Sequence, residues 1–480
     1  MYDVAIIGCG ITGAAAAYEL SRYQLNTVVL EKENDVCDAT TKANSAIIHA
    51  GYDPLPGTLM AKLNVEGAAL AKELCHSLDV PYKQIGSLVL AFSESEQNTL
   101  HTLYERGVQN SVPGIRLLSA EEVRAMEPAV SEQVTGALYA PSAGVVSPWE
   151  YGIALAETAV RNGVELKRSS EVRSIKRIEN GWRISTAKGD VEAKYIINAA
   201  GLNSAAVHNM AAEPKFHIEP VKGEYYLLDK SEGSRVSHII FQCPNEDGKG
   251  VLVSPTVHGN LIVGPNAQHV EDYTDVSNTA QGLQFVKQAA VRSVPSIVFR
   301  DNIRNFAGLR ATSEKDDFII EIAAPGFVDL AGIKSPGLSA APAIAKYAVE
   351  LLRKEGLVTV NKSCWNGSRK KVRFASLSPE KKNELIRQNP AYGRIICRCE
   401  TITEGEILDA LHSPIPPCSL DGVKRRAGNG MGRCQGGFCG PRVLDIMARE
   451  YRVTPEEILQ DVDGSYILVG ETKQGGNADV

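Results

Sequence analysis

The sequence predicts an α/β fold followed by a small helical domain at the C-terminal end. Two segments carry the α/β signal: "YDVAIIGCGITG" at the start and "FVDLAGIKSPGLSAAPAIAKYAVELL" near residue 330 both follow the order strand, glycine-rich turn, helix. The third observation is a set of four cysteines between short helical patterns after residue 390. A chain of 480 residues has room for about three domains of roughly 100 to 200 residues each.

Composition and charge restrict the functional class. With 44% hydrophobic and 22% charged residues, the chain has the composition of an ordinary soluble globular protein. Its net charge of −6, without a long basic block, gives no reason to expect a nucleic-acid partner. The apolar run "VAIIGCGITGAAAAYEL" lacks a basic leader, and no later segment reaches the roughly 18 apolar residues of a membrane span. We therefore expect a cytoplasmic protein without a membrane span, whose ten cysteines indicate metal or redox chemistry rather than disulfides.

The first strand and turn carry a nucleotide-binding pattern. Gly8, Gly10 and Gly13 have the spacing G-x-G-x-x-G, and the next strand, "NTVVLEK", ends at Glu31. Glycines let the backbone approach a pyrophosphate, the helix N-terminus favours its charge, and Glu31 can accept a hydrogen bond from a ribose hydroxyl. Strand, turn, helix and acidic residue together predict a dinucleotide site.

Later segments indicate that the dinucleotide is FAD. The segment "ATTKANSAIIHAGYD" is rich in hydroxyl and amide side chains and can lie along a cofactor of that length. "EVRSIKRIENGWRIST" predicts a hairpin around Asn180 and Gly181, and "KYIINAAGLNS" predicts a buried strand that runs into a glycine turn. Near residue 330 a further helix follows a glycine turn, with Ser339 as the expected N-cap. The N-terminus of this helix and Lys334 would stabilise the negative charge of reduced flavin.

Five stretches, in this order, resemble one enzyme family: "NSAIIHAGYD", "KGEYYLLDK", "TVHGNLIVGPNA", "FAGLRA" and "AGIKSPGLS". Residues 1–355 resemble the D-amino-acid-oxidase-like family of FAD oxidoreductases, and within it the glycerol-3-phosphate and L-2-hydroxyglutarate dehydrogenases. The resemblance implies a Rossmann-like FAD-binding domain from parts near 1–80, 145–215 and 300–355. It also implies an antiparallel-sheet substrate domain from parts near 81–144 and 216–299.

The motifs and the resemblance together give one set of candidate cofactor-binding residues. They are Gly8, Gly10, Ile11, Thr12, Gly13, Glu31, Lys32, Thr40, Thr41, Asn44, Ser45, Val172, Ala200, Gly201, Gly308, Gly332, Gly337, Leu338 and Ser339.

The resemblance also implies that hydride leaves a substrate carbon for the flavin while a base takes the hydroxyl proton. His49 is the candidate base, and a structural histidine bonded to a loop carbonyl is the alternative. Arg310 is the candidate for binding an anionic substrate through its bidentate fork, with an ion pair to Asp316 as the alternative. Lys334 is expected to serve the flavin, the substrate or both.

Two segments of the implied substrate domain contain further candidates. Tyr225 and Tyr226 alternate on one strand, so only one of them can face the site, and the sequence leaves open which. His258 in "TVHGNLIV" is expected to be structural, because His-Gly-Asn predicts a hairpin turn.

We expect the substrate to be a small anionic 2-hydroxy compound, for which two identities compete. Membrane-associated glycerol-3-phosphate dehydrogenases tend to carry an extra arginine just after the histidine loop, whereas this chain has "HAGYDP", which favours L-2-hydroxyglutarate. The C-terminal domain favours sn-glycerol 3-phosphate, oxidised to dihydroxyacetone phosphate, because it resembles the large subunit of anaerobic glycerol-3-phosphate dehydrogenase. We give the C-terminal domain slightly more weight.

The C-terminal region divides into three parts. Residues 356–392 are polar and basic and are predicted to be a linker, residues 393–450 form the small helical domain, and residues 451–480 form a tail. The first helix of this domain is predicted by a capping box of Thr403 with Glu406. A second helix is predicted near "SLDGVKRR", and a third from Pro441.

Four cysteines of this domain form two close pairs in sequence, Cys397 with Cys399 and Cys434 with Cys439. Structural zinc usually recruits C-x-x-C or slightly longer knuckles, a pattern that C-x-C with C-x-x-x-x-C does not match. The domain resembles the 2Fe-2S module of the bacterioferritin-associated-ferredoxin type. We therefore expect a 2Fe-2S cluster, with zinc as the alternative. Cys418 lies outside both pairs and is expected to be an ordinary thiol.

A cluster gives the two electrons of reduced flavin a one-electron exit. Arg433 and the run from Lys424 to Arg426 are expected to offset the negative charge of this site. The expected partner is an electron-accepting protein subunit carrying flavin or iron–sulfur, in an oligomer or hetero-complex that could also bring the chain to a membrane. An electron-transfer or redox-sensing protein with a structural flavin is the alternative from another class.

Overall fold

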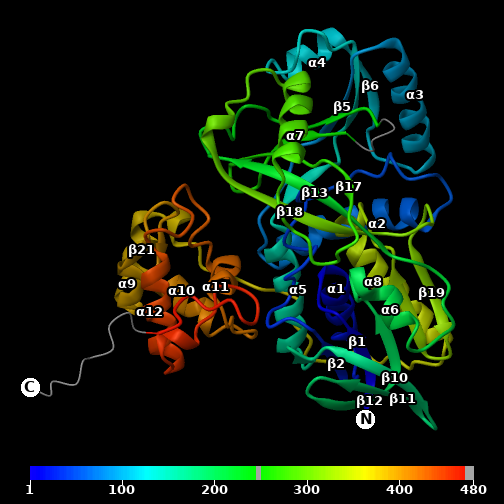
Figure 1. The fold of residues 1–480 in the computed structure, drawn as a ribbon, viewed down its shortest axis with the longest axis vertical. Coiled ribbons are helices and arrows are strands. Elements are labelled where there is room, and N and C mark those ends of the chain that lie inside the picture. Colours follow the sequence, from blue (N-terminus) through cyan, green and yellow to red (C-terminus); the bar gives the residue numbers. More distant parts are fainter. Residues whose placement is uncertain (245–249, 471–480) are drawn as a thin grey trace, which may run out of the picture. The chain divides into compact units, whose positions relative to one another are not determined.

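The computed structural model describes residues 1–244 and 250–470 of the chain (Figure 1). Two compact units divide these residues. Unit 1 comprises Met1–Lys32 and Val36–Lys370, and unit 2 comprises Glu33–Asp35 and the chain from Lys371 onward. Each unit has its own hydrophobic core, and each is described separately below.

The first sheet of unit 1 is built on parallel strands. Its central strands are short apolar runs that are buried almost throughout, which is typical of parallel sheets with both faces covered. The parallel pairings join β1 (Tyr2–Ile7), β2 (Thr27–Leu30), β9 (Glu165–Lys167), β12 (Gly189–Asn198) and β20 (Phe327–Ala331). The antiparallel strands β10 (Val172–Ile178), β11 (Gly181–Thr186) and β19 (Ile319–Ala324) extend this sheet. The predicted hairpin turn falls between Ile178 and Gly181, which face each other in register.

The second sheet of unit 1 has nine strands, of which β13 (Glu219–Leu228) and β18 (Asn302–Thr312) pair antiparallel along their whole length. The other strands are β5 (Ser87–Ala91), β6 (Arg116–Ser119), β7 (Gly136–Ala140), β14 (Ile239–Gln242), β15 (Leu252–Pro255), β16 (Leu261–Gly264) and β17 (Gln268–His269). All the pairings in this sheet are antiparallel except that of β14 with β5, which is parallel. A small third sheet joins β3 (Ile47–Ile48), β4 (Tyr82–Gln84) and β8 (Gly144–Val146).

Helices cover the sheets of unit 1. They are α1 (Ile11–Leu20), α2 (Leu59–Ser77), α3 (Glu94–Gln109), α4 (Ala120–Met126), α5 (Pro148–Arg161), α6 (Ser204–His208), α7 (Ala280–Ser293) and α8 (Gly337–Lys354). The predicted α/β fold is therefore confirmed: the strands of a mainly antiparallel sheet alternate along the chain with segments of the mainly parallel sheet. One local prediction is wrong: α8 begins after Pro336 with no side-chain cap, so Ser339 lies inside its first turn rather than at the N-cap.

Unit 2 is a small helical body. It contains α9 (Pro379–Gln388), the short strands β21 (Ile395–Cys397) and β22 (Ile402–Thr403), α10 (Glu404–Leu411), α11 (Leu420–Ala427) and α12 (Gly440–Tyr451). The predicted capping box is present, because the Thr403 hydroxyl accepts from the Glu406 N–H and the Glu406 carboxylate accepts from the Thr403 N–H. Of the segment predicted as a linker, residues 356–370 belong to unit 1 and residues 371–392, which include α9, belong to unit 2. Residues 471–480 of the predicted tail lie outside the described residues.

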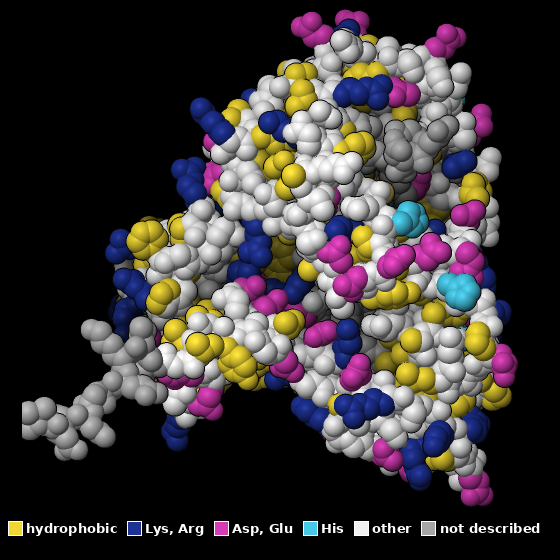
Figure 2. All heavy atoms as spheres, in the orientation of Figure 1, with side chains coloured by type: hydrophobic (Ala, Val, Ile, Leu, Met, Phe, Trp, Pro, Cys, Tyr) yellow, Lys and Arg dark blue, Asp and Glu magenta, His cyan; other side chains and the backbone are white. Residues whose placement is uncertain are grey.

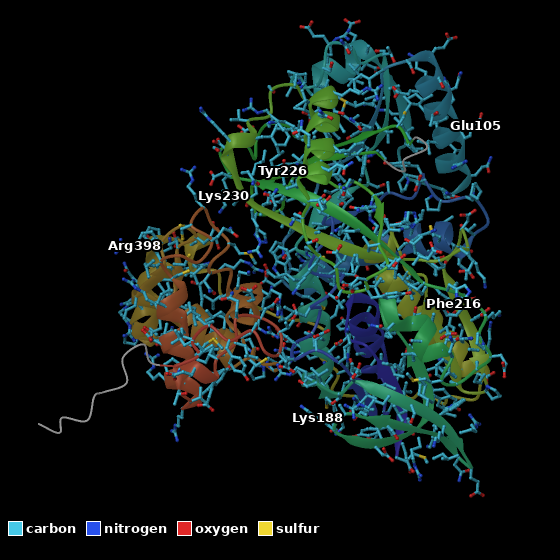
Figure 3. The ribbon with its side chains drawn as sticks, in the orientation of Figure 1. Glu105, Lys188, Phe216, Tyr226, Lys230 and Arg398 are labelled. Atoms are coloured by element: carbon cyan, nitrogen blue, oxygen red, sulfur yellow. The ribbon has the colours of Figure 1, made fainter. Side chains whose placement is uncertain are left out.

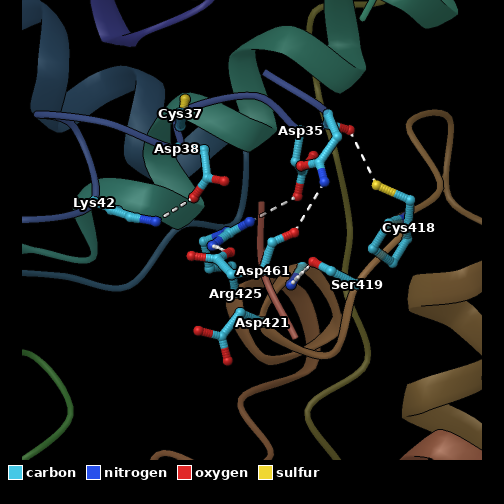
Figure 4. Close-up of polar contacts among 12 residues, drawn as sticks. Asp35, Cys37, Asp38, Lys42, Cys418, Ser419, Asp421, Arg425 and Asp461 are labelled. Atoms are coloured by element: carbon cyan, nitrogen blue, oxygen red, sulfur yellow. Dashed lines mark hydrogen bonds and ion pairs between the residues drawn. The ribbon is translucent and has the colours of Figure 1, made fainter. Parts of the chain in front are cut away.

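A buried ion-pair network holds the segment Glu33–Asp35 within unit 2 (Figure 4). Arg426 donates from both terminal nitrogens to the Asp35 carboxylate at 2.8 Å, and Arg425 bridges Asp35 at 3.2 Å and Asp461 at 2.8 Å. Lys424 pairs with Asp421 at 2.7 Å. Each of the three side chains that we expected to offset the charge of the metal site, Lys424 to Arg426, forms an ion pair with a carboxylate.

No helix within residues 1–244 and 250–470 combines the length and apolar character that crossing a membrane requires.

Candidate functional site: a cofactor edge and a cysteine cluster

The turns that follow four parallel strands carry several of the predicted cofactor residues. Gly8 and Gly10 follow β1, Glu31 follows β2, Ala200 and Gly201 follow β12, and Gly332 follows β20. The register pairs Ile7 with Leu30 and Asn198, and Asn198 with Asp329, so these strands end side by side. Ligands of open α/β sheets bind at this carboxyl edge.

The glycines of the first turn are required by close packing. Gly8 has a φ of +95°, and a Cβ there would lie 2.6 Å from the Ala199 carbonyl oxygen. A Cβ on Gly13 would lie 2.0 Å from the Gly8 carbonyl oxygen. Helix α1 begins after Gly10 without a side-chain cap. Among the residues that the structure describes, only its first N–H, that of Ile11, donates to a side chain, the Thr41 hydroxyl at 2.9 Å. The first turn, which includes Thr12, therefore keeps backbone N–H groups that fit a phosphate.

Glu31 is buried beside this turn, and its carboxylate accepts a hydrogen bond of 2.6 Å from the Cys9 N–H. A carboxylate held this way can accept from a ribose hydroxyl with its remaining capacity. The neighbouring Lys32 is exposed. The glycine turn, the helix N-terminus and Glu31 together fit the adenosine half of FAD.

The loop of residues 40–45 connects this edge with the nine-stranded sheet. The Thr40 hydroxyl donates to the Leu309 carbonyl at 2.8 Å, and a Cβ on Gly308 would lie 1.9 Å from the Ala43 carbonyl oxygen. Asn44 donates to the carbonyls of Thr40 and Thr41, which fixes the loop conformation. The predicted residue Val172, at the start of β10, is partly buried and packs against the core that includes residues of β1 and β2.

His49 lies against the beginning of α8. Its backbone N–H donates to the Ser339 hydroxyl at 2.7 Å, and its ring Nε2 is 3.3 Å from the Ser335 hydroxyl. The ring stacks on Phe241 with a centroid distance of 5.7 Å. Three predicted site residues, His49, Lys334 and Ser339, are thus brought together with Gly337 and Leu338 at one helix N-terminus.

Lys334 and Arg310 both reach backbone carbonyls. The Lys334 ammonium donates to the Lys315 carbonyl at 3.4 Å, and the Arg310 guanidinium donates to the Asn266 carbonyl at 3.3 Å. Within the part of the chain that the structure describes, neither cation forms an ion pair, so the alternative pairing of Arg310 with Asp316 is not realised. Both half-buried cations can therefore take an anionic ligand.

The structure also decides between the two tyrosines. The Tyr225 hydroxyl is 3.2 Å from the Ser45 hydroxyl, and its ring stacks on Phe306 at 4.7 Å, so Tyr225 faces the 40–45 loop. Tyr226 points to the opposite side of the sheet and contacts Phe299. His258 lies in the turn between β15 and β16 and stacks on Trp149.

Three residues that contact His49 or Arg310 were not predicted from the sequence. Ser335 and Phe241 contact the His49 ring, and Asn266 accepts from Arg310. Ser335 could have been found from its place beside Lys334 in "GIKSPGLS". Phe241 on β14 and Asn266 in the connection between β16 and β17 are distant in sequence from the residues they contact, so no local pattern points to them.

Four of the five cysteines of unit 2 gather as two pairs that differ from the pairs in sequence. The sulfurs of Cys399 and Cys434 are 3.6 Å apart, and Cys397 pairs with Cys439. The hydrogen bond from the Cys439 thiol lowers the pKa of Cys397 to about 6, while this pairing and burial raise the pKa of Cys439. A low pKa favours the thiolate, which is the form that binds metal.

The separation of the Cys399 and Cys434 sulfurs fits two thiolates bound to one metal ion. Two thiolates about 2.3 Å from one tetrahedral ion are roughly 3.7 Å apart, close to the separation of Cys399 and Cys434. Two thiol pairs can hold the two irons of a 2Fe-2S cluster, one pair on each iron. Cys418 stays outside, and its thiol donates to the Asn34 carbonyl at 3.2 Å.

Comparison with known families assigns both units. The model described as "FAD dependent oxidoreductase" matches residues 3–351. The chain belongs to this family. The model described as "BFD-like [2Fe-2S] binding domain" matches residues 395–449. The predicted resemblance, FAD and the 2Fe-2S cluster are confirmed for this FAD-dependent oxidoreductase.

Individual relatives show which enzymes of the family this chain is similar to. The oxidoreductase is 52% identical to glycerol 3-phosphate dehydrogenase of Caloramator mitchellensis, over 98% of this chain and 99% of the relative. The solved structure of dithionite-reduced L-α-glycerophosphate oxidase from Mycoplasma pneumoniae with FAD bound has a TM-score of 0.73 and 33% identity, covering 78% of this chain and 99% of that chain. Human mitochondrial L-2-hydroxyglutarate dehydrogenase is 33% identical over only 55% of this chain and 61% of its own length.

Proposed function

We propose that the protein is an FAD-dependent dehydrogenase that oxidises sn-glycerol 3-phosphate to dihydroxyacetone phosphate and passes the electrons through its 2Fe-2S cluster to a protein partner. The observation that carries this proposal is the pair of half-buried cations, Arg310 and Lys334, neither of which forms an ion pair within the described residues. The match to glycerol 3-phosphate dehydrogenase over both units favours a phosphate ester over a 2-hydroxy acid.

In this proposal each polar side chain has a distinct task. Arg310 binds the phosphate with its planar fork, and Lys334 adds positive charge at the N-terminus of α8. The His49 ring accepts the hydroxyl proton of the substrate, held in orientation by Ser335 and Phe241. When bound, FAD supplies the hydride acceptor.

The cofactor residues have roles in the same proposal. The turn from Gly8 to Gly13 and Glu31 hold the nucleotide, and the loop of residues 40–45 lines its length. Cys397, Cys399, Cys434 and Cys439 hold the two irons. The electron acceptor is a flavin or iron–sulfur protein.

Anaerobic titration of the purified holoenzyme tests the function. We expect sn-glycerol 3-phosphate to bleach the flavin absorbance, and dihydroxyacetone phosphate to appear in equal amount. Rapid bleaching by L-2-hydroxyglutarate, with none by sn-glycerol 3-phosphate, would transfer the activity to 2-hydroxy acids. Bleaching by neither would favour an electron-transfer protein with a structural flavin.

A further inference from the structure

A cationic surface with one exposed aromatic ring surrounds the cluster cysteines. We call it the cluster face and define it by Arg398, Arg433, Phe438 and Arg442, each within three residues of a cluster cysteine. Figure 2 shows Lys and Arg side chains along the edge of unit 2 at which Figure 1 labels α9 and β21, and Figure 3 labels Arg398, which follows β21. All four side chains are exposed.

Phe438 is the feature that folding alone does not explain. It is 80% exposed, although it directly precedes Cys439, which is 1% exposed. A phenyl ring has 150 to 250 Å² of surface to bury and gains most from a protein interface. Its position beside the cluster therefore indicates that a partner covers it.

The arginines of the cluster face differ from others in unit 2. Arg394 and Arg449 both pair with Glu404, at 2.8 and 2.7 Å. In contrast, neither Arg398 nor Arg442 forms an ion pair or hydrogen bond within the described part of the chain. The carboxylates on the same segments are Glu400, half-buried over Gly432, and the exposed Asp445. The cluster face is net positive.

The two cysteine pairs differ in their exposure to solvent, and the more exposed pair belongs to this face. Cys399 is exposed and Cys434 is half-buried, whereas Cys397 and Cys439 are each 1% exposed. In the pair nearer to solvent, Cys399 directly follows Arg398 and Cys434 directly follows Arg433 in sequence. A carrier that binds here reaches the solvent-facing side of the cluster by the shortest path.

We propose that the cluster face is the docking site of an acidic one-electron carrier protein. Carboxylates of the carrier pair with Arg398 and Arg442, and Phe438 packs into an apolar spot beside the carrier's redox centre. This proposal rests on the proposed function. Oxidation of one CH–OH to C=O releases two electrons and two protons, so two oxidised carriers each take one electron and the protons pass to solvent. Attraction between opposite charges suits such repeated, brief encounters.

The experiment uses the holoenzyme with two probe carriers of opposite charge, an acidic flavodoxin and a basic cytochrome c. The test variant is R398E/R442E. The control is K381E/R387E on α9, which changes the net charge equally on the same unit. Binding is measured by titration calorimetry at low and high salt, and a separate measurement follows flavin bleaching by substrate.

We expect flavodoxin to bind the wild type with salt-sensitive affinity, and R398E/R442E to lose about tenfold or more of it while the control stays within about threefold. The test variant should gain affinity for cytochrome c. F438A should weaken flavodoxin binding with little change in salt dependence. All variants should retain wild-type flavin bleaching.

Three outcomes overturn the proposal. Equal flavodoxin binding by R398E/R442E and the control would show that the cluster face does not bind the carrier. A change in oligomeric mass only in R398E/R442E assigns the face to a second copy of the chain. Slower reduction of the cluster by substrate, with unchanged flavodoxin binding, would show that the cluster face binds the flavin-binding unit rather than a carrier. Failure of the proposed function has a different signature, because carrier binding would still follow the arginines while sn-glycerol 3-phosphate bleached no flavin.

Discussion

Gly223 provides the space in which Arg310 lies. The residue pairs with Gly308 across β13 and β18, and a Cβ there would be 2.8 Å from Nη2 of Arg310 and 2.7 Å from the Pro265 Cβ. Its φ is not in the left-handed region, so only the space above it requires glycine. Because Gly223 has no side chain, the Arg310 guanidinium can lie above it and reach the Asn266 carbonyl.

We predict that G223A raises the KM for sn-glycerol 3-phosphate about tenfold, because the methyl group displaces the guanidinium by a fraction of an ångström from its binding geometry. The flavin content and the maximum rate of flavin reduction should change much less. The check is a double-mutant cycle with R310Q in stopped-flow reduction. Additive effects on KM would contradict a route through Arg310.

His49 is tested by replacement with glutamine. The backbone N–H of the residue still donates to Ser339, but the amide cannot accept a proton. We predict that H49Q slows anaerobic flavin reduction by about 10² to 10⁴ with unchanged FAD content. The matched control is H258Q, in a turn packed on Trp149, which should reduce at the normal rate. Normal reduction in H49Q would assign proton removal to another group.

At the scale of elements, an ion pair fastens the loop between β17 and α7 to β13. Lys222 is 1% exposed, and its ammonium is 2.6 Å from the Asp275 carboxylate. The loop leads to Thr279, whose N–H and hydroxyl both donate to the buried carboxylate of Glu224, which also accepts from Asn266. This chain of contacts supports the carbonyl that Arg310 reaches.

We predict that D275N lowers stability by about 2 kcal/mol at pH 7, because it leaves a buried ammonium without its counter-charge. The hydrogen bond from Lys222 lowers the pKa of Asp275 from its ordinary 3.8 to about 2. The carboxylate therefore contributes its full stability above pH 3.8 and loses it as the pH falls toward 2. Melting curves should show the gap between wild type and D275N closing over that interval. D272N, in the same loop without a buried lysine, should show a much smaller gap; an equal gap would contradict the argument.

The sequence predicted those elements whose cause is local. The capping box of Thr403 and Glu406, the glycine turn after β1 and the hairpin at Gly181 each depend on residues a few positions apart. Ser339 was misplaced because a proline, rather than a hydroxyl residue, precedes α8. The Ser339 hydroxyl instead accepts from the N–H of His49, which directly follows β3 and is 290 positions away in sequence. The partners of Arg425 and Arg426 include Asp35, about 390 positions away, and no local pattern identifies such a pair.

At the scale of the whole molecule, each unit carries one half of the chemistry. Unit 1 holds the strand ends that carry the predicted cofactor residues, together with Arg310 and Lys334. Unit 2 holds the four paired cysteines, and two of them, Cys397 and Cys439, belong to its core with Ile407, Val443 and Met447. Because unit 2 has this core of its own, loss of the exposed thiol pair should leave its helices folded. Substrate oxidation and electron delivery are therefore separable by substitution in the full chain.

We predict that C399S/C434S loses its iron and acid-labile sulfide and no longer reduces flavodoxin, while sn-glycerol 3-phosphate still bleaches its flavin at the wild-type rate. A serine hydroxyl remains protonated at neutral pH and binds iron poorly, whereas the thiolates it replaces are the ligands of such clusters. Iron and sulfide analysis measures the cluster content, a flavodoxin reduction assay measures electron delivery, and anaerobic flavin spectra measure substrate oxidation. Circular dichroism checks that the helices of unit 2 stay folded. C418S is the matched control, because its thiol donates to the Asn34 carbonyl and lies outside both pairs. If C399S/C434S still delivered electrons at the normal rate, the flavin would be the site of exit, and the cysteines would have a structural role.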